Sequence, residues 1–143
     1  MKRKASARWQ GSAKDGTGTL SAQSGTLRDT PYSFKGRFGD GKGTNPEELV
    51  AAAHAGCFTM ALSFTLNNAG FTAEAIDSEA LLTMDEVDGK PTITAVHLTT
   101  RARVPGVDAP RFAAIANEAK AGCVVSRALS PTITITLDAA LAS

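Results

Sequence analysis

The sequence predicts a single α+β domain over residues 1–143, with its elements in the order βββ-α-ββ-α-β. Three observations favour this fold class. The first third of the chain is rich in Gly, Thr and Ser and carries short alternating stretches. A long apolar helical stretch follows it, and two longer alternating runs then precede a second helix and a last strand. One domain suits a chain of this length, because domains most often contain about 100–150 residues.

Composition narrows the class of protein. The hydrophobic content of 43% is ordinary for a globular protein, and a net charge of +1 gives a nucleic-acid or membrane-surface partner no electrostatic support. We expect no apolar run to reach the roughly 18–20 residues of a membrane span. The basic start, Met1 to Lys4, is not followed by the apolar segment of an export signal. We therefore expect a cytoplasmic protein whose thiols are mostly reduced.

The first third is expected to form a β-meander. Residues 4–9 and 18–22 alternate as strands do, and residues 24–26 form a turn between extended segments. Residues 32–38 are expected to be extended as well. In that conformation Tyr32, Phe34 and Phe38 would share one face of the strand.

The helical stretch that follows has a clear beginning and end. Asn45 is a good cap, Pro46 suits the first helical position, and Glu48 suits the third. The helix is expected to run to Asn68, with Gly70 in the left-handed conformation beyond it. Its interior is apolar nearly all round, which is typical of a helix buried on most sides. A single chain of this size offers few such places, so the pattern indicates an interface between subunits.

The second half of the chain supplies the remaining elements. A clean alternation places Val96, Leu98 and Thr100 on one side of a strand and His97 on the other. Asp88-Gly89 is a hairpin signal. The expected elements are strands at 76–84 and 92–104, a helix from Asp108 to Gly122, and a last strand at 132–139.

Cys57 and Cys123 are the residues most informative about chemistry. Cys57 lies inside the apolar helix, where it could simply be a small buried side chain. Cys123 directly follows a helix-ending glycine, where a core thiol is less expected. Two cysteines that meet in space could cycle between thiols and a disulfide, one attacking an oxidant and the other resolving the sulfenic acid. Their spacing does not establish that they meet.

A reactive cysteine is a thiolate, which needs positive charge or a helix N-terminus nearby. Arg37 could supply that charge, held by a carboxylate in bidentate pairing, or it could be a solvated charge on an edge strand. Glu47 could be such a carboxylate or could simply complement the helix dipole. Glu47 and Cys57 are ten residues apart, roughly 15 Å along a straight helix. Both can serve one site only if the helix breaks near Gly56 or a second subunit contributes.

Other classes of protein remain open on these residues. His54 and Cys57 share a helix face and could form a metal site with Cys123, although the spacing is no zinc signature. No cofactor-binding motif is present, so we expect neither a metal nor a cofactor. A redox sensor or thiol-binding protein could use the same cysteines without turnover. A structural dimer with inert cysteines is the remaining alternative.

Two motifs resemble one known family. The stretches GTNPEELVAAAHAGCFTMAL at 43–62 and AKAGCVVSRAL at 119–129 resemble the OsmC/Ohr family of osmotically inducible and organic hydroperoxide resistance proteins. RFGDGKGTNPEEL and VPGVDAPRF bring the chain closest to the OsmC branch, and the resemblance covers nearly the whole chain in order. One residue departs from the pattern, because Val124 stands where the family often has proline after the second cysteine.

The resemblance implies a thiol-dependent peroxidase of oxidative and osmotic stress defence. By the resemblance, Cys57 is the peroxidatic cysteine and Cys123 the resolving one, while Arg37 and Glu47 orient the thiolate. The implied fold is an intertwined homodimer, in which two antiparallel sheets wrap central helices and the active sites lie at the dimer interface. A hydroperoxide is the implied substrate and an external dithiol the implied reductant. The apolar side chains of Phe58, Met60, Phe34 and Phe38 could then favour organic hydroperoxides over hydrogen peroxide.

Overall fold

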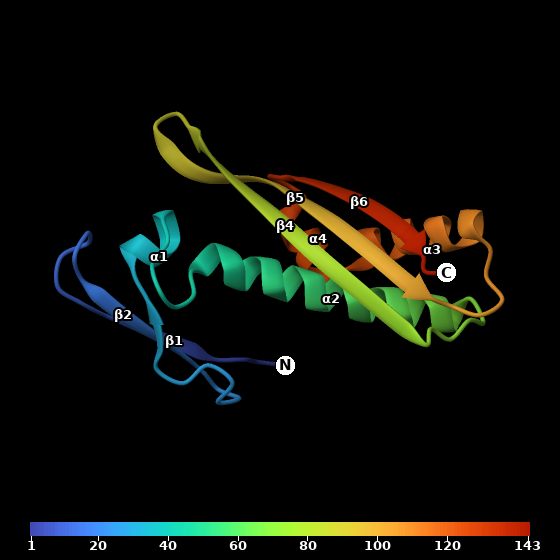
Figure 1. Cartoon of the computed structure of the whole chain (residues 1–143), viewed down its shortest axis with the longest axis horizontal. Coiled ribbons are helices and arrows are strands. Elements are labelled where there is room, and N and C mark those ends of the chain that lie inside the picture. The colour runs from blue at the N-terminus through green and yellow to red at the C-terminus, as the bar shows by residue number, and fades with distance from the viewer. The chain divides into compact units, whose positions relative to one another are not determined.

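The computed structural model describes all 143 residues, which form two compact units, residues 1–49 and 50–143. The secondary structure is α+β, as expected (Figure 1). In chain order the elements are β1 Ala5–Gln10, β2 Thr17–Ala22, β3 Thr30–Tyr32, α1 Phe34–Phe38, α2 Pro46–Asn68, β4 Ala75–Val87, β5 Lys90–Arg103, α3 Ala109–Gly122, α4 Val124–Leu129 and β6 Thr134–Leu141.

The first unit holds the expected meander, an antiparallel sheet in the order β1-β2-β3. The expected extended segment over residues 32–38 is wrong beyond Tyr32, because the short helix α1 takes its place. The Ser33 hydroxyl accepts a hydrogen bond from the Gly36 N–H and caps this helix. The backbone of Gly41 then packs against Gly36, so closely that a Cβ at residue 41 would lie 2.4 Å from the Gly36 nitrogen.

Helix α2 begins in the first unit and continues through the second without a break. Asn45 caps it as expected, because its side-chain oxygen accepts a hydrogen bond from the Glu48 N–H at 2.8 Å. Gly70 follows the helix with a φ of +88°. The suggested break near Gly56 is wrong, since α2 is helical on both sides of that residue.

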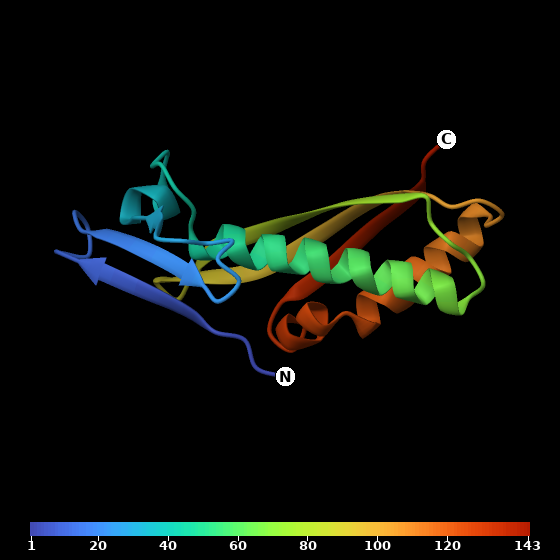
Figure 2. The same cartoon turned by 90° about the horizontal axis from the view of Figure 1, so that it is seen from below.

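The second unit places one sheet on one face of α2, α3 and α4 (Figures 1 and 2). Strands β4 and β5 form an antiparallel hairpin, whose turn residues Asp88 and Gly89 both have positive φ. Strand β6 pairs with β5 in parallel. The expectation of antiparallel sheets therefore holds for the β1-β2-β3 sheet and for β4 with β5, but is wrong for β6. The cause is the connection through α3 and α4, which carries the chain back along β5 before β6 begins.

The core of the second unit lies between this sheet and the helices. Strand β5 buries the side chains predicted to share one face, while His97 is on the opposite face. Helix α2 contributes a single stripe at a spacing of four residues, which comprises His54, Phe58, Leu62 and Leu66. Helix α3 contributes Phe112, Ile115, Ala116 and Ala119.

Outside that stripe, α2 residues are exposed or partly exposed in the single chain. Met60 is 76% exposed and Phe64 69%, so the expected burial on most sides does not occur within one chain. α2 is also long and apolar enough to cross a membrane, with a mean hydropathy of 1.6 over its best window. By that measure the expectation of no span-length apolar run is wrong. One such helix is weak evidence for a membrane protein, since apolar helices of globular proteins meet the same criterion.

Candidate active site

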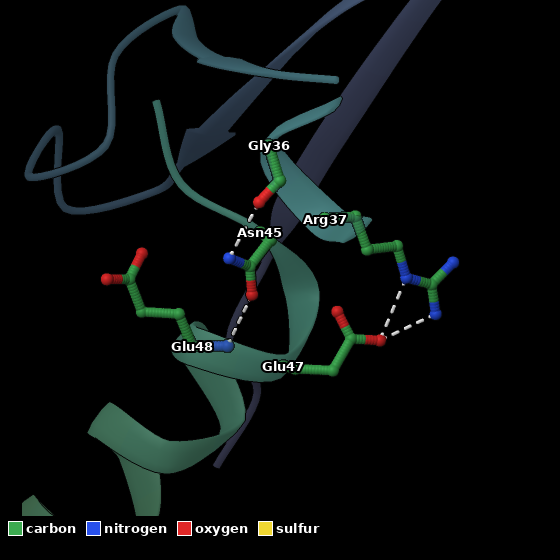
Figure 3. A network of polar contacts seen from close by, with 5 residues as sticks. All are labelled: Gly36, Arg37, Asn45, Glu47 and Glu48. Carbon is green, nitrogen blue, oxygen red and sulfur yellow. Dashed lines mark hydrogen bonds and ion pairs between the residues drawn. The ribbon is translucent and has the colours of Figure 1, made fainter. Parts of the chain in front are cut away.

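Arg37 and Glu47 form an ion pair in the first unit (Figure 3). Glu47 Oε1 accepts two hydrogen bonds, from Arg37 Nε at 2.9 Å and from Arg37 Nη2 at 2.6 Å. The expected pairing through both carboxylate oxygens is therefore replaced by pairing through one. The second oxygen, Oε2, is buried and has no partner. Arg37 also lies over the Phe38 ring, with its guanidinium carbon 5.2 Å from the ring centroid.

Asn45 fixes the position of this ion pair. Its side-chain oxygen caps α2, while its side-chain nitrogen donates to the Gly36 carbonyl in α1 at 3.1 Å (Figure 3). One side chain thus ties the turn that carries Arg37 to the turn that carries Glu47. Glu48 has a different partner, because its carboxylate accepts a hydrogen bond from the Thr44 hydroxyl at 2.6 Å.

An aromatic cavity adjoins Arg37 within the same unit. It has a volume of about 300 Å³. The Phe34 and Phe38 rings that help line it are 4.8 Å apart between centroids. Its lining residues are Trp9, Ala13, Tyr32, Ser33, Phe34, Arg37, Phe38 and Pro46. The only charged side chain on this wall is therefore the guanidinium of the ion pair.

Cys57 and Cys123 lie together in the second unit, as the cycling hypothesis requires. Both are free thiols, and the Cys57 side chain lies close enough to the Cys123 sulfur to influence its ionisation. Cys57 is partly exposed on α2, whereas Cys123 is buried between α3 and α4. The fold thus pairs an accessible thiol with an enclosed one.

Hydrogen-bonding groups make Cys123 more acidic than an ordinary thiol. Burial raises the pKa of Cys123, but the Ser126 backbone and hydroxyl, the Cys57 side chain and the Val125 backbone outweigh burial and lower that pKa. The Cys123 side chain makes no capping hydrogen bond to α4. The Ser126, Val125 and Cys57 groups therefore act on the sulfur as nearby dipoles. A lower pKa increases the fraction of Cys123 present as the nucleophilic thiolate.

Helix α4 and the functional position of Ser126 were not predicted from the sequence. Cys123 is both the C-cap residue of α3 and the N-cap residue of α4, and its backbone has φ −59° and ψ 126°. The spacing Cys123-x-x-Ser126 at a helix start is the signal that could have identified this serine, because residues three apart share a helix face. The suggested metal site is not formed, since no group of three His, Cys, Asp or Glu side chains could hold an ion.

Residues 39–138 match the family model described as OsmC-like protein. The chain belongs to this family. It is 50% identical over 133 residues to peroxiredoxin OsmC of Escherichia coli, covering 93% of each protein. It is 32% identical over 100 residues to the organic hydroperoxide resistance protein OhrA of Bacillus subtilis, covering 69% of each.

A solved structure confirms the OsmC-like fold. The crystal structure of the organic hydroperoxide resistance protein OhrB of Bacillus subtilis superposes with a TM-score of 0.71 at 25% sequence identity. The match covers 95% of this chain and 97% of that one. The family resemblance inferred from the two cysteine motifs is thereby confirmed for sequence and fold.

Val124 offers a test of the turn that holds Cys123 in this OsmC-like protein. Val124 is 70% exposed at the first position of α4, where proline is favoured, and the extended ψ of Cys123 suits a residue before proline. We expect Val124→Pro to raise the free energy of unfolding by about 0.4–1 kcal/mol, by restricting the unfolded chain. Urea unfolding measures the change.

Val125→Pro is the matched control for this substitution. It removes a backbone N–H near the Cys123 sulfur and forces Val124 out of helical geometry. We expect it to destabilise the protein. Equal destabilisation by both prolines would show that the turn at Cys123 differs from the one described.

Proposed function

We propose that this chain is a two-cysteine peroxidase that reduces organic hydroperoxides and is reset by an external dithiol. Peroxidase activity is supported by its relatives, which are named a peroxiredoxin and organic hydroperoxide resistance proteins. The observation that carries the two-cysteine mechanism is the proximity of the partly exposed Cys57 to the buried Cys123. Steady-state consumption of cumene hydroperoxide, with dithiothreitol as reductant, tests the proposal.

The proposed peroxidase reaction proceeds in three steps. The Cys57 thiolate attacks the terminal oxygen of the hydroperoxide, the O–O bond breaks, and the leaving alkoxide takes a proton to become an alcohol. The Cys123 thiolate then attacks the Cys57 sulfenic sulfur, forming a disulfide and releasing hydroxide, which is protonated to water. A dithiol finally reduces the disulfide by exchange and is itself oxidised to a disulfide.

Arg37 acts in the first step of this mechanism. Its guanidinium favours the Cys57 thiolate and the negative charge that develops on the leaving oxygen. Glu47 acts through Arg37, because its Oε1 holds two of the guanidinium N–H groups and leaves the others for substrate. Glu47 is therefore a positioning residue.

The aromatic cavity beside Arg37 supports a preference for organic substrates. Phe34 and Phe38 line it and could cover the hydrocarbon part of an alkyl or aryl hydroperoxide. Phe58, considered with them in the sequence analysis, cannot contribute, because its side chain is fully buried in the core. Hydrogen peroxide has no hydrocarbon part and gains nothing from this surface.

A homodimer is part of the proposal. The exposed Met60 and Phe64 form an apolar surface on α2 that a second copy of the chain would cover. Because α2 does not break near Gly56, the partner subunit is the remaining way in which Glu47 and Cys57 can serve one site. We place this dimer in the cytoplasm, where reducing dithiols are available.

Glu47→Gln tests the role of the ion pair. The substitution keeps the shape of the side chain but removes the charge that holds Arg37. We expect kcat/KM for cumene hydroperoxide to fall by about 10- to 100-fold, because the guanidinium is no longer held in place. Glu48→Gln is the matched control, since Glu48 contacts Thr44 rather than Arg37. Equal losses in both variants would contradict a specific role for Glu47.

A further inference from the structure

His54 and Ser126 form a buried contact that the peroxidase mechanism above does not use. His54 Nε2 lies 2.7 Å from Ser126 Oγ, and both side chains are buried. The two residues come from α2 and α4, and they are 72 positions apart in the sequence. Ser126 is also the residue whose backbone and hydroxyl face the Cys123 sulfur. The side chains of His54, Ser126, Cys123 and Cys57 therefore lie near one another in the core of the second unit.

The hydrogen-bonding partners of His54 and Ser126 favour one arrangement of their protons. The Ser126 hydroxyl has a single proton, which can go either to His54 or to the Cys123 sulfur. His54 Nδ1 is buried without a partner, and burial lowers the pKa of His54, so its ring stays neutral. If Nδ1 carried the proton, a buried N–H donor would be left unpaired. Placing the proton on Nε2 leaves only an unpaired acceptor and lets Ser126 donate to Cys123.

We propose that His54 and Ser126 form a positioning relay for Cys123, in which the His54 Nε2–H holds the Ser126 oxygen so that the Ser126 proton points at the Cys123 sulfur. Ser126 lies three residues after Cys123 at the start of α4 and acts on the sulfur itself, while His54 acts through Ser126. Because His54 occupies one side of the Ser126 oxygen, the hydroxyl proton has fewer directions open to it. The relay therefore stabilises the thiolate form of Cys123 in a core that would otherwise favour the thiol.

The consequence for turnover rests on the proposed function. After Cys57 has become a sulfenic acid, Cys123 attacks it as the thiolate. A relay that keeps Cys123 ionised accelerates this closing step and shortens the time in which Cys57 could be oxidised further. The buried half of the cysteine pair thus has its own activating groups, separate from the Arg37–Glu47 pair of the first unit.

Other ionisable groups face this region, and their effect on the ionisation of Cys123 must be separated from that of the relay. Cys57 lies close to the Cys123 sulfur. Lys120 and Arg127 line a cavity of about 300 Å³ that Ser126 also lines, and their positive charges would favour a thiolate as well. Arg127→Gln therefore measures the contribution of through-space charge, and the Cys57→Ala background removes the second thiol.

The test measures the ionisation of Cys123 without any peroxide. In Cys57→Ala protein, thiolate absorbance at 240 nm is followed against pH, with the protein lacking both cysteines as the blank. We expect Ser126→Ala to raise the ionisation midpoint of Cys123 by about 1–2 pH units, the effect of losing one hydrogen bond to a charged group. His54→Phe should raise it by about half as much, because the hydroxyl is retained but no longer held.

Conservative variants and a matched control separate the relay from general damage to the core. Ser126→Thr keeps the hydroxyl, and His54→Gln keeps an amide N–H near the Nε2 position. In both variants the ionisation midpoint of Cys123 should therefore stay close to that of the Cys57→Ala parent. His97→Gln alters the other histidine, which also contacts a hydroxyl, that of Thr136, but lies on the exposed face of β5. This substitution should leave the ionisation midpoint of Cys123 unchanged. Thermal unfolding of each variant verifies that it is folded.

Two results would overturn the relay. One is a Ser126→Ala midpoint within about 0.3 pH units of its parent, a change too small for a lost charged hydrogen bond. The other is a shift of equal size in His97→Gln. If His54→Phe does not fold, the smaller Ser126→Ala change still decides the question. Failure of the protein to reduce peroxide would refute the proposed function while leaving this titration interpretable.

Discussion

Cys57→Ser protein is expected to consume cumene hydroperoxide no faster than dithiothreitol alone. The alcohol of serine is not ionised near neutral pH and forms no sulfenic acid, so the first step of the cycle has no nucleophile. Cys57 lies on a partly exposed position of α2, and the exchange of sulfur for oxygen there should leave the core intact. Peroxide consumption under steady-state conditions measures the loss.

Thr59→Val is a suitable control for the Cys57 substitution. Thr59 is also partly buried on α2, and its hydroxyl donates a hydrogen bond to the Ala55 carbonyl of the same helix. We expect it to keep the peroxidase rate of the unmodified chain. A Cys57→Ser protein that kept the full rate would show that another group attacks the peroxide, and the proposed mechanism would then be wrong.

Cys123→Ser has the second largest expected effect and a different kinetic signature. One equivalent of hydroperoxide should react rapidly at Cys57, after which turnover should stop. When no dithiol is added, the sulfenic acid in this variant has no thiol partner, so excess peroxide oxidises it to the irreversible sulfinic acid. Rapid-mixing kinetics show the single burst, and mass spectrometry shows two added oxygen atoms on the peptide that contains Cys57.

The extent of over-oxidation distinguishes a resolving cysteine from a structural one. If Cys123 only filled space in the core, Cys57 would be over-oxidised equally in Cys123→Ser and in the unmodified chain. Equal amounts of Cys57 sulfinic acid in the two proteins would therefore contradict the role proposed for Cys123. The unmodified chain, treated with the same peroxide excess, supplies the reference for over-oxidation.

Local patterns predicted much of this fold. The cap formed by Asn45, the Asp88-Gly89 turn and the alternation along β5 each depend on residues close together in sequence, and each occurs in the structure. The order of strands and helices was also largely correct. The two cysteine motifs predicted the family, because each combines a rare residue with a distinctive helical context.

Features that depend on distant contacts were not predictable in the same way. The parallel pairing of β5 with β6 depends on where α3 and α4 return the chain, which alternation alone cannot show. Helix α1 replaced an expected strand because the Ser33 cap and the close approach of Gly41 outweigh the aromatic alternation of Tyr32, Phe34 and Phe38. The contact between His54 and Ser126 joins two helices far apart in sequence and had no local signal.

The apolar character of α2 shows the same limit from the other side. The sequence indicated a helix covered on most sides, but one chain covers only the stripe that includes Phe58. Composition thus reports the environment that a helix needs, without stating whether its own chain provides it. The exposed Met60 and Phe64 are accounted for by the proposed dimer rather than by the fold of one subunit.

The central claim is that Cys57 and Cys123 form a disulfide as each peroxide is reduced. It is tested most directly by adding one equivalent of cumene hydroperoxide to the reduced protein, counting the remaining thiols, and identifying linked peptides by mass spectrometry without reduction. We predict that both thiols disappear together, that a Cys57–Cys123 link forms within one chain, and that hydrogen peroxide acts more slowly. Two thiols still free in excess peroxide would contradict the account and indicate inert, structural cysteines.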